Sequence, residues 1–276
     1  HLCKGLLDQG FTPSITDPCL WIHHDCIIYQ YVDDCLIFAN TDQTIDSFIH
    51  QMRQAGYLLK DEGTVENFLG INIDHSASTR GKKVFEMKQT GLIETVMDDL
   101  NLNADRCKLH NTPSDRILHP DLNIPVFEEA WNYRSIIGKL NFLALNTRPD
   151  IAFAVHQCAR FSSNPCQTHG AAVKRIGRYL KATMNKGLIF CPGGSHSLHA
   201  MCDADFAGTW NKEYANHRST ALSRTGFVLY YSGCPVVWQS KLQTEIALST
   251  CESEYIALSQ CARVLIPLRR IINEIA

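Results

Sequence analysis

Hydrophobic positions near the start of the chain predict two closely spaced strands. The segments Cys26–Val32 and Cys35–Ala39 are short, apolar and rich in β-branched and aromatic residues, which is typical of strands. Only Asp33 and Asp34 separate them. Because two strands joined by two turn-forming residues make a tight hairpin, we predict that both aspartates lie at a hairpin tip, at one end of a sheet.

A helix and a second pair of strands are predicted next. Apolar residues recur with helical spacing in Thr44–Gly56, and its glycine is a typical helix end. Val65–Asp74 reads as a strand, and Lys83–Lys88 as its hairpin partner. Strands combined with a helix in this order predict an α+β arrangement for residues 1–90.

The pattern becomes helical after Lys88. Four helices are predicted from their apolar spacing, at Thr90–Leu102, Glu128–Leu145, Arg148–Phe161 and Thr168–Thr183. Thr168 is a suitable N-cap for the last of them.

That last helix is amphipathic. On a helical wheel Lys174, Arg178 and Lys181 fall within about 60° of each other, and the apolar residues occupy another face. The sequence therefore predicts a stripe of basic side chains along this helix.

Glycine and proline interrupt the helical pattern at Cys191–Ser195, which we interpret as a domain boundary. Strand-like segments follow, and a helix begins at about Ser249. The predicted strands are Leu198–Ala207, Arg224–Gly233 and Pro235–Ser240. The predicted domains are thus residues 1–90, 91–190 and 196–276.

Composition changes this picture through charge. The chain has 276 residues and a net charge of only −2, but the charge is unevenly distributed. Residues 1–130 hold 10 basic and 20 acidic residues, whereas residues 131–202 hold 9 basic and 1 acidic. No acidic residue occurs between Ile151 and Cys202. Such a block predicts an anionic partner, with nucleic acid as the main candidate. The sequence contains no run of about 18 apolar residues, so no membrane span is predicted.

Cysteines and histidines show no metal-binding spacing. The 12 cysteines include no C-x-x-C pair, so neither a zinc ribbon nor a redox pair is indicated, and free thiols fit a reducing compartment. His196 and His199 come nearest to a ligand pair, and we interpret them as ordinary polar residues near a strand start. The opening "HLCKGLLDQG" reads as the middle of a longer protein.

Two interpretations of the adjacent carboxylates Asp33 and Asp34 remain open. Aspartate is common in turns because its side chain bonds nearby backbone groups. Alternatively, the pair binds Mg²⁺, which takes oxygen ligands from one or two carboxylates, water and substrate phosphates. Two such ions can activate an attacking oxygen and stabilise a leaving one.

The second half of the chain has carboxylates of its own. Asp203 and Asp205 are two residues apart on a predicted strand, so both should point to one face. Ser249 and Glu252 match a capping box, which gives Glu252 a structural role at a helix start. Glu254 then remains available for a catalytic role.

The sequence Tyr31-Val32-Asp33-Asp34 resembles the Y-x-D-D hairpin of reverse transcriptases. Further segments resemble copia-type retrotransposon polyproteins, in order and with similar spacing, over essentially the whole chain. These segments are "QGFTPSITDPCLWI", "VENFLGINI", "YRSIIGKLNFLALNTRPDIAFAV", "RSTALSRTGFVLYYSGCPVVWQSKLQTEIALST" and "CESEYIALSQ".

The resemblance implies a mixed α+β and α/β fold. Residues 1–90 would be the C-terminal part of a reverse-transcriptase palm, residues 91–190 a helical thumb and connection, and residues 196–276 the N-terminal part of an RNase H-like domain. Asp33 and Asp34 would be two of the three polymerase carboxylates, and the first, from an upstream strand, has no match here. Asp203 and Glu254 would bind metal for RNase H, with Asp205 left open. The implied contacts with nucleic acid are made by Tyr31, Val32, Phe68, Leu69, Gly70, Lys174, Arg178 and Lys181.

The function implied by the resemblance is RNA-directed DNA synthesis coupled to hydrolysis of RNA in a hybrid. The implied cofactor is Mg²⁺, for which Mn²⁺ can substitute. The implied partners are an RNA template, a DNA primer or RNA–DNA hybrid and deoxynucleoside triphosphates. The implied location is the cytoplasm, in virus-like particles, or the nucleus. Because catalytic carboxylates are missing from both sites, we expect residues 1–276 alone to be inactive.

Two other interpretations remain. Asp203-Ala204-Asp205 is a D-x-D sequence, which glycosyltransferases use to hold a metal-bound sugar nucleotide, but this reading leaves the hairpin aspartates and the basic block unexplained. The chain could also be a non-catalytic, nucleic-acid-binding remnant of a mobile element.

Overall fold

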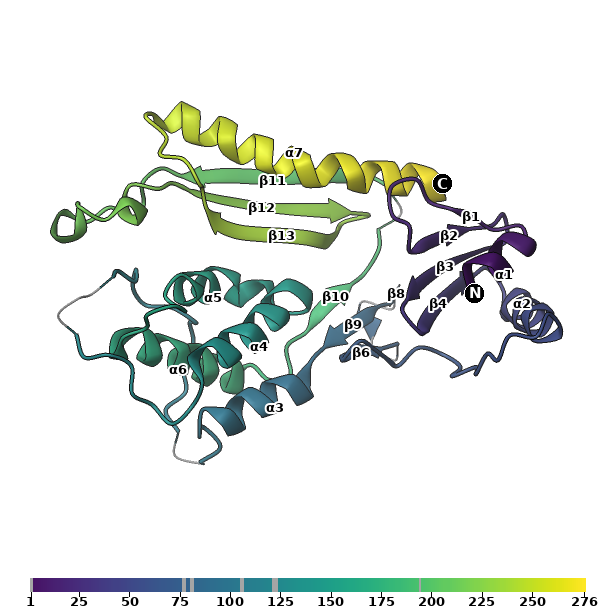
Figure 1. Ribbon diagram of the computed structural model, residues 1–276, viewed down its shortest axis with the longest axis horizontal. Coiled ribbons are helices and arrows are strands. Elements are labelled where there is room, and N and C mark those ends of the chain that lie inside the picture. Colours follow the sequence, from purple (N-terminus) through teal and green to yellow (C-terminus); the bar gives the residue numbers. More distant parts are fainter. Residues whose placement is uncertain (1, 76–77, 80–81, 105–106, 121–123, 194) are drawn as a thin grey trace. The chain divides into compact units, whose positions relative to one another are not determined.

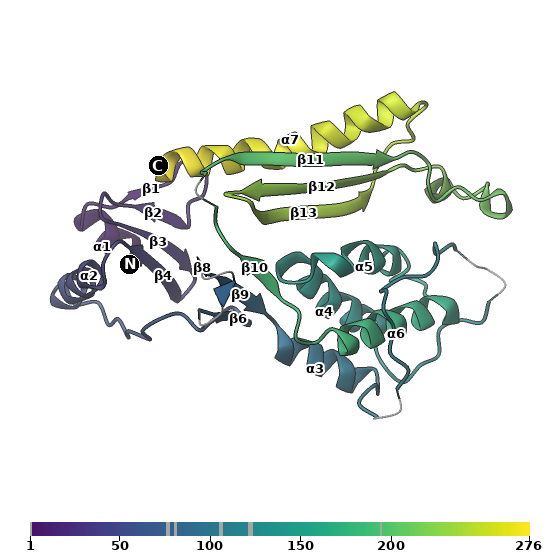
Figure 2. The ribbon, with the colours of Figure 1, turned by 180° about the vertical axis from the view of Figure 1, so that it is seen from behind.

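The computed structural model describes residues 2–75, 78–79, 82–104, 107–120, 124–193 and 195–276 (Figures 1 and 2). The chain forms two compact units. Unit 1 comprises His1–Val65 together with Ala262–Ala276, and unit 2 comprises Glu66–Cys261. Within the described ranges, no helix combines the length and the apolar character needed to cross a membrane.

Unit 1 is built on a four-stranded antiparallel sheet in the order β1-β2-β3-β4. Its core contains Leu6, Phe11, Trp21, Ile28 and Met52. The elements are α1 (Leu2–Asp8), β1 (Thr12–Pro13), β2 (Leu20–Ile22), β3 (Cys26–Tyr31), β4 (Asp34–Ala39) and α2 (Asp42–Gln54).

Helix α2 begins two residues before its predicted start. The side chain of Thr41 accepts a hydrogen bond from the backbone N–H of Thr44 and caps the helix. The helix ends shortly before Gly56, whose φ of +89° is readily adopted by glycine.

Unit 2 begins with a second antiparallel sheet, in the order β10-β9-β6-β5. The predicted pairing of its strands is confirmed, because Ile73 lies opposite Met87 in the β6–β9 ladder. The strands are β5 (Asn67–Phe68), β6 (Ile71–Asp74), β9 (Phe85–Lys88) and β10 (Leu188–Phe190), and a separate short pair is formed by β7 (Ser78–Thr79) and β8 (Lys82–Lys83).

The predicted strand Val65–Asp74 is interrupted by a turn. Leu69 and Gly70 have φ values of +50° and +77°, the left-handed pair expected of a tight hairpin turn between β5 and β6. A strand at residues 188–190 was not predicted, because it follows a long helical pattern and contains only three residues.

Four α-helices and one 3₁₀ turn form the main core of unit 2. Its most buried members include Ile136, Leu140, Leu143, Val173 and Ile176. The elements are α3 (Thr90–Asp99), α4 (Tyr133–Asn146), η1 (Pro149–Ile151), α5 (Ala152–Ala159) and α6 (Gln167–Ala182).

Capping groups explain where two of these helices differ from prediction. Helix α4 begins five residues after the predicted Glu128, because the side chain of Asn132 accepts a hydrogen bond from Ser135 N at 3.0 Å. The N-cap of α6 is Cys166 rather than Thr168, and His169 Nδ1 accepts a hydrogen bond from Cys166 N at 3.1 Å. The histidine thus takes the place of the glutamate of an ordinary capping box.

An ion pair between a buried arginine and an exposed aspartate lies at the start of η1 and is bonded to the end of α6. Arg148 is only 2% exposed, and its Nε and Nη2 donate to the two carboxylate oxygens of Asp150 at 2.9 and 2.7 Å. Arg148 Nη1 donates to Thr183 O at 3.1 Å, and Tyr179 Oη donates to Asp150 at 2.7 Å.

The third sheet of unit 2 is antiparallel, in the order β11-β12-β13. The N-terminal part of α7 lies along one face of it, and α4 and α5 lie on the opposite side (Figures 1 and 2). Gln243 Nε2 donates to Ser253 O of α7 at 2.9 Å, and Trp238 Nε1 donates to Ala144 O of α4 at 2.7 Å. The elements are β11 (Leu198–Asp205), η2 (Lys212–Tyr214), η3 (Arg218–Thr220), β12 (Arg224–Tyr231), β13 (Cys234–Leu242) and α7 (Thr250–Ile275).

The chain therefore has a mixed fold of helices and strands, as predicted, and the described sheets are antiparallel. The segment Cys191–Ser195 is bonded to the β12–β13 turn through Gly193 N and Ser232 O, and Gly194 lies outside the described residues. The domain spans 1–90, 91–190 and 196–276 stay predictions.

Candidate functional site

The hairpin that carries Asp33 and Asp34 is formed by β3 and β4. Its ladder runs from Cys26 opposite Ala39 to Tyr31 opposite Asp34. The turn is therefore Val32-Asp33, one residue earlier than predicted, and Asp34 is the first residue of β4.

Both aspartates are exposed, as are Tyr31 and Val32. No described residue donates a hydrogen bond to either carboxylate or forms an ion pair with it. The hairpin tip thus presents two unpaired carboxylates whose oxygen atoms are the donors that Mg²⁺ prefers.

The turn has a backbone conformation that the sequence did not indicate. Val32 has a φ of +52° and is 74% exposed. A β-branched residue rarely adopts the left-handed region, and such a residue costs of order 1–3 kcal/mol. The turn therefore holds strain next to Asp33.

We expect Val32→Gly to stabilise unit 1 by about 1 kcal/mol. Glycine removes the left-handed strain, and this gain exceeds the entropy that a new glycine costs, about 0.5–1 kcal/mol. The measurement is urea unfolding followed by circular dichroism. Val32→Ala is the control, because it keeps Cβ and hence most of the strain. Equal stabilisation by the alanine variant would show that the backbone conformation is not the cause.

Phe68, Leu69 and Gly70 lie together at the β5–β6 turn. Leu69 is exposed there. Their implied contact with nucleic acid stays a prediction.

Asp203 and Asp205 lie on one face of β11, as predicted. Side chains along this strand alternate between half-buried and exposed, and both aspartates are exposed. Asp203 pairs with Gly226, which has no side chain, and borders a groove of about 360 Å³. Phe153 of α5 and Trp238 of β13 also line that groove.

Glu254 lies on α7, which packs against the other face of the sheet through Ser253, Ala257 and Cys261. It is exposed, and no described contact joins it to Asp203. The structure therefore places Asp203 on the groove side of the sheet and Glu254 on the helix that packs against the other side. Their shared role stays a prediction.

The capping role of Glu252 is confirmed. Its backbone N–H donates to Ser249 Oγ at 3.1 Å, and its carboxylate accepts from Leu248 N at 2.7 Å. Glu252 therefore holds the first turn of α7.

Asp205 lies beside a buried cation that sequence reasoning missed. Its cross-strand neighbour Arg224 is buried, donates to His156 Nδ1 at 3.1 Å and lies 4.7 Å from the ring centroid of Phe153. Burial, reinforced by the charge of Arg160, lowers the pKa of Arg224 to about 10, and Asp205 opposes this shift. Burial also lowers the pKa of His156 to about 4, so its ring is neutral and accepts the bond. No sequence signal marks an arginine at a strand start as buried.

Two members of the predicted basic stripe have partners within the chain. Lys174 Nζ pairs with Glu129 at 2.8 Å, and Lys181 Nζ donates to the carbonyl oxygens of Leu102 and Ala104 at 2.7 and 3.0 Å. Arg178 is half-buried, and its Nε has no described partner. Nucleic-acid binding by this stripe stays a prediction.

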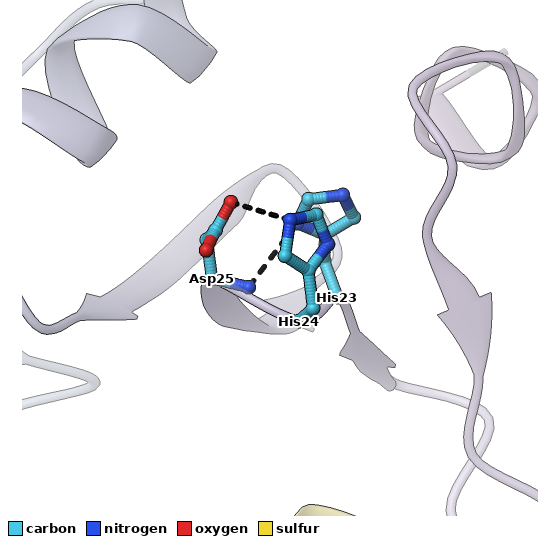
Figure 3. A group of neighbouring side chains, drawn as sticks. All are labelled: His23, His24 and Asp25. Carbon is cyan, nitrogen blue, oxygen red and sulfur yellow. Dashed lines mark hydrogen bonds and ion pairs between the residues drawn. The ribbon is translucent and has the colours of Figure 1, made fainter.

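Within the described part of the chain, one group of three potential metal ligands has its donor atoms within 4.8 Å of one another. It consists of His23, His24 and Asp25, between β2 and β3 (Figure 3). Sequence reasoning missed this group because it looked for ligands separated by several residues. The signal that could have found it is three adjacent donors between two predicted strands.

Comparison with known proteins shows that most of the chain is similar in sequence to transposon proteins. The chain is 33% identical over 97% of its length to a retrovirus-related Pol polyprotein from transposon TNT 1-94 of Nicotiana tabacum, of which it covers 20%. It is 31% identical over 92% of its length to the Pol polyprotein from transposon RE1 of Arabidopsis thaliana, of which it covers 17%. The chain thus spans about a fifth of the length of these relatives.

A shorter relative is covered more completely. The chain is 30% identical over 84% of its length to a putative transposon Ty5-1 protein of Saccharomyces cerevisiae, of which it covers 71%. No family model matches the chain. No solved structure matches it either.

Proposed function

Because the chain belongs to the copia-type Pol polyproteins of transposons, we propose that it forms part of a reverse transcriptase joined to part of an RNase H domain. The hairpin carries this proposal. It presents two exposed carboxylates, with no partner among the described residues, at the tip of two paired strands within the sequence Tyr31-Val32-Asp33-Asp34.

In the proposed polymerase, Asp33 and Asp34 hold Mg²⁺, and Mn²⁺ can substitute for it. When bound, the metal would neutralise phosphate charge and assist attack of a primer 3′-hydroxyl on the α-phosphate of a deoxynucleoside triphosphate, with pyrophosphate as the leaving group. The β3–β4 ladder fixes the position of both carboxylates, which is the main contribution that this chain makes to the chemistry. Tyr31 and Val32, exposed at the same tip, contact the primer and the RNA template.

The RNase H assignment rests on Asp203 and Glu254. Asp203 is exposed beside the groove, opposite a glycine that leaves the strand surface open. Glu254 is exposed on the first turns of α7. We propose that Asp203 is a metal ligand for hydrolysis of the RNA strand in a hybrid; the role of Glu254 rests on the sequence resemblance alone.

The test of this function is RNA-templated primer extension by a longer polyprotein that contains residues 1–276. Synthesis should require a divalent metal and the hairpin carboxylates. Synthesis that survives removal of both carboxylates would contradict the proposal. Binding of a primed template without any synthesis would favour a non-catalytic remnant.

The segment Ile151–Cys202, which contains no acidic residue, supports binding to an RNA–DNA hybrid. We expect the logarithm of affinity to fall steeply with the logarithm of salt concentration. Neutralising Lys174, Arg178 and Lys181 together should flatten this slope by up to about three phosphate contacts. The measurement is a salt titration of binding to a labelled hybrid.

A matched triple variant separates the stripe from overall charge. Lys212, Arg263 and Arg269 are exposed and have no described partner. Their replacement removes the same charge and should change the slope less than replacement of the stripe. Because Lys181 bonds two backbone carbonyls, circular dichroism must show that the stripe variant is folded. Equal slopes in both variants would show that the stripe faces elsewhere.

A further inference from the structure

We propose that His23, His24 and Asp25 form a binding site for a late first-row divalent cation such as Zn²⁺, Ni²⁺ or Cu²⁺, separate from the carboxylate hairpin. The three residues follow one another in the turn between β2 and β3. The turn is closed by a hydrogen bond from His23 N to Cys26 O at 2.9 Å.

The donor atoms of this turn converge. One donor atom from each residue lies within 4.8 Å of the other two. His24 Nε2 is 2.8 Å from Asp25 Oδ2, and the two imidazole rings lie 4.0 Å apart between centroids (Figure 3). Ligand atoms bound at about 2.0–2.2 Å to one tetrahedral cation lie roughly 3.3–3.6 Å apart, so side-chain rotations can bring these donors to that spacing.

The first ligand is held in place by the core of unit 1. The ring of His23 lies 5.1 Å from that of Phe11, which is 3% exposed and itself packs against Phe48 at 5.3 Å. Asp25 N donates to His23 Nδ1 at 3.4 Å, a long bond that an ion would displace if it took that nitrogen. An ion would therefore meet one ligand that is already positioned.

The other two ligands can move to complete the site. The side chains of His24 and Asp25 are 75% and 56% exposed, so they can rotate toward an ion at little cost. Two neutral imidazoles and a carboxylate leave at least one coordination position for water. The residues carry one negative charge, which favours a divalent cation.

The donor set selects the class of metal. Imidazole suits Zn²⁺, Cu²⁺ and Ni²⁺, whereas Mg²⁺ prefers oxygen donors in an octahedral arrangement. The site also lies away from the hairpin carboxylates. Strand β3 separates the two turns, and its six residues span roughly 20 Å.

Zinc titration of the complete 276-residue chain, produced without a histidine tag, tests the proposal. In equilibrium dialysis the wild type should bind one more Zn²⁺ per chain than His24→Ala or Asp25→Asn. Zn²⁺ should also raise the thermal unfolding temperature of the wild type more than that of either variant, because a ligand that binds only the folded state stabilises it. Excess Mg²⁺ should not displace this ion.

His50→Ala is the matched control, because His50 is an exposed histidine of the same unit and bonds only to Gln54 among the described side chains. It should bind as much Zn²⁺ as the wild type. His23→Ala should also lose the ion, but it removes packing on Phe11, so the exposed His24 and Asp25 decide the test if that variant unfolds. Equal zinc binding by the wild type and His24→Ala would overturn the proposal.

The 12 cysteines provide a competing class of metal ligand. Titration with Co²⁺ distinguishes the two, because a thiolate ligand adds a charge-transfer absorption that imidazole and carboxylate do not. The difference between the Co²⁺ spectra of the wild type and of Asp25→Asn should lack the thiolate absorption. If it contains the thiolate absorption, the ion lies at a cysteine, and the turn is not the site.

Discussion

Replacing Asp33 with asparagine in a Pol polyprotein that contains this segment should lower RNA-templated DNA synthesis by roughly a hundredfold or more. A neutral amide is a much poorer ligand for Mg²⁺ than a carboxylate, and it does not offset the charge on the metal. The change should leave the fold intact, because Asp33 is exposed at a turn and has no side-chain partner among the described residues. Single-turnover extension of a primed RNA template measures the loss.

Asp46→Asn is the control for this experiment. Asp46 is also exposed in unit 1, on the surface of α2, and has no described partner. It should support synthesis at the wild-type rate, whereas Asp34→Asn should fail like Asp33→Asn. Near-normal synthesis by Asp33→Asn, or an equal loss in Asp46→Asn, would remove the hairpin from the active site.

Replacing Arg148 with methionine should destabilise the protein by about 1.5–3 kcal/mol, the cost typical of losing hydrogen bonds to a charged group, because Asp150 itself stays 36% exposed. Arg148 is almost completely buried and forms four hydrogen bonds, two to Asp150 and two to Thr183. Its removal leaves the Asp150 carboxylate with Tyr179 as its one side-chain donor among the described residues. Urea unfolding followed by circular dichroism gives the change in free energy.

Arg134→Met provides the comparison, because the Arg134 side chain is exposed and bonds only to Ser162 O among the described residues. We expect a loss of less than about 1 kcal/mol there. Adding Asp150→Asn to Arg148→Met should recover part of the stability, since no charge is then left unpaired. A double variant less stable than Arg148→Met would contradict this account.

The same ion pair predicts how stability depends on pH. Burial alone would raise the pKa of Asp150, but hydrogen bonds from Arg148 and Tyr179 and the charge of Arg148 outweigh it and hold the pKa below its usual value. The folded-state pKa is therefore depressed, so this stabilisation is complete above the unfolded pKa, about 3.9, and is lost as pH falls through the folded value. In Arg148→Met this contribution to acid sensitivity should shrink in urea midpoints measured across that range, because the hydrogen bond and the charge of Arg148 no longer lower the pKa.

Local sequence pattern predicted most strands and helices because their apolar spacing agrees with their tertiary packing. The β3–β4 hairpin was predicted one residue out of register. Two aspartates are better turn formers than Val32, yet the observed ladder brings Tyr31 opposite Asp34 and leaves the valine in the turn. Similarly, Cys166 caps α6 although cysteine is a poor N-cap, because His169 completes the capping box.

The site could be predicted only in part, because contacts between residues far apart in the sequence cannot be read from a local pattern. A helical wheel shows that Lys174 and Lys181 share a face, but it cannot show that Glu129 and the carbonyls of Leu102 and Ala104 lie against that face. The converging donors around His23 depend on the tight turn between β2 and β3, which brings three adjacent side chains to one point.

The discontinuous composition of unit 1 has a consequence for its synthesis on the ribosome. Its first 65 residues emerge early, but its last segment, Ala262–Ala276, follows only after all of unit 2. At about 5–20 residues per second, translation of the intervening segment takes roughly 10–40 s. Until then Ile15 N has no Glu274 carboxylate to bond to, although that contact is present in the folded chain at 3.0 Å. In a nascent polyprotein, unit 1 could therefore begin to fold before unit 2 is made, but it could complete its fold only after unit 2 has been synthesised.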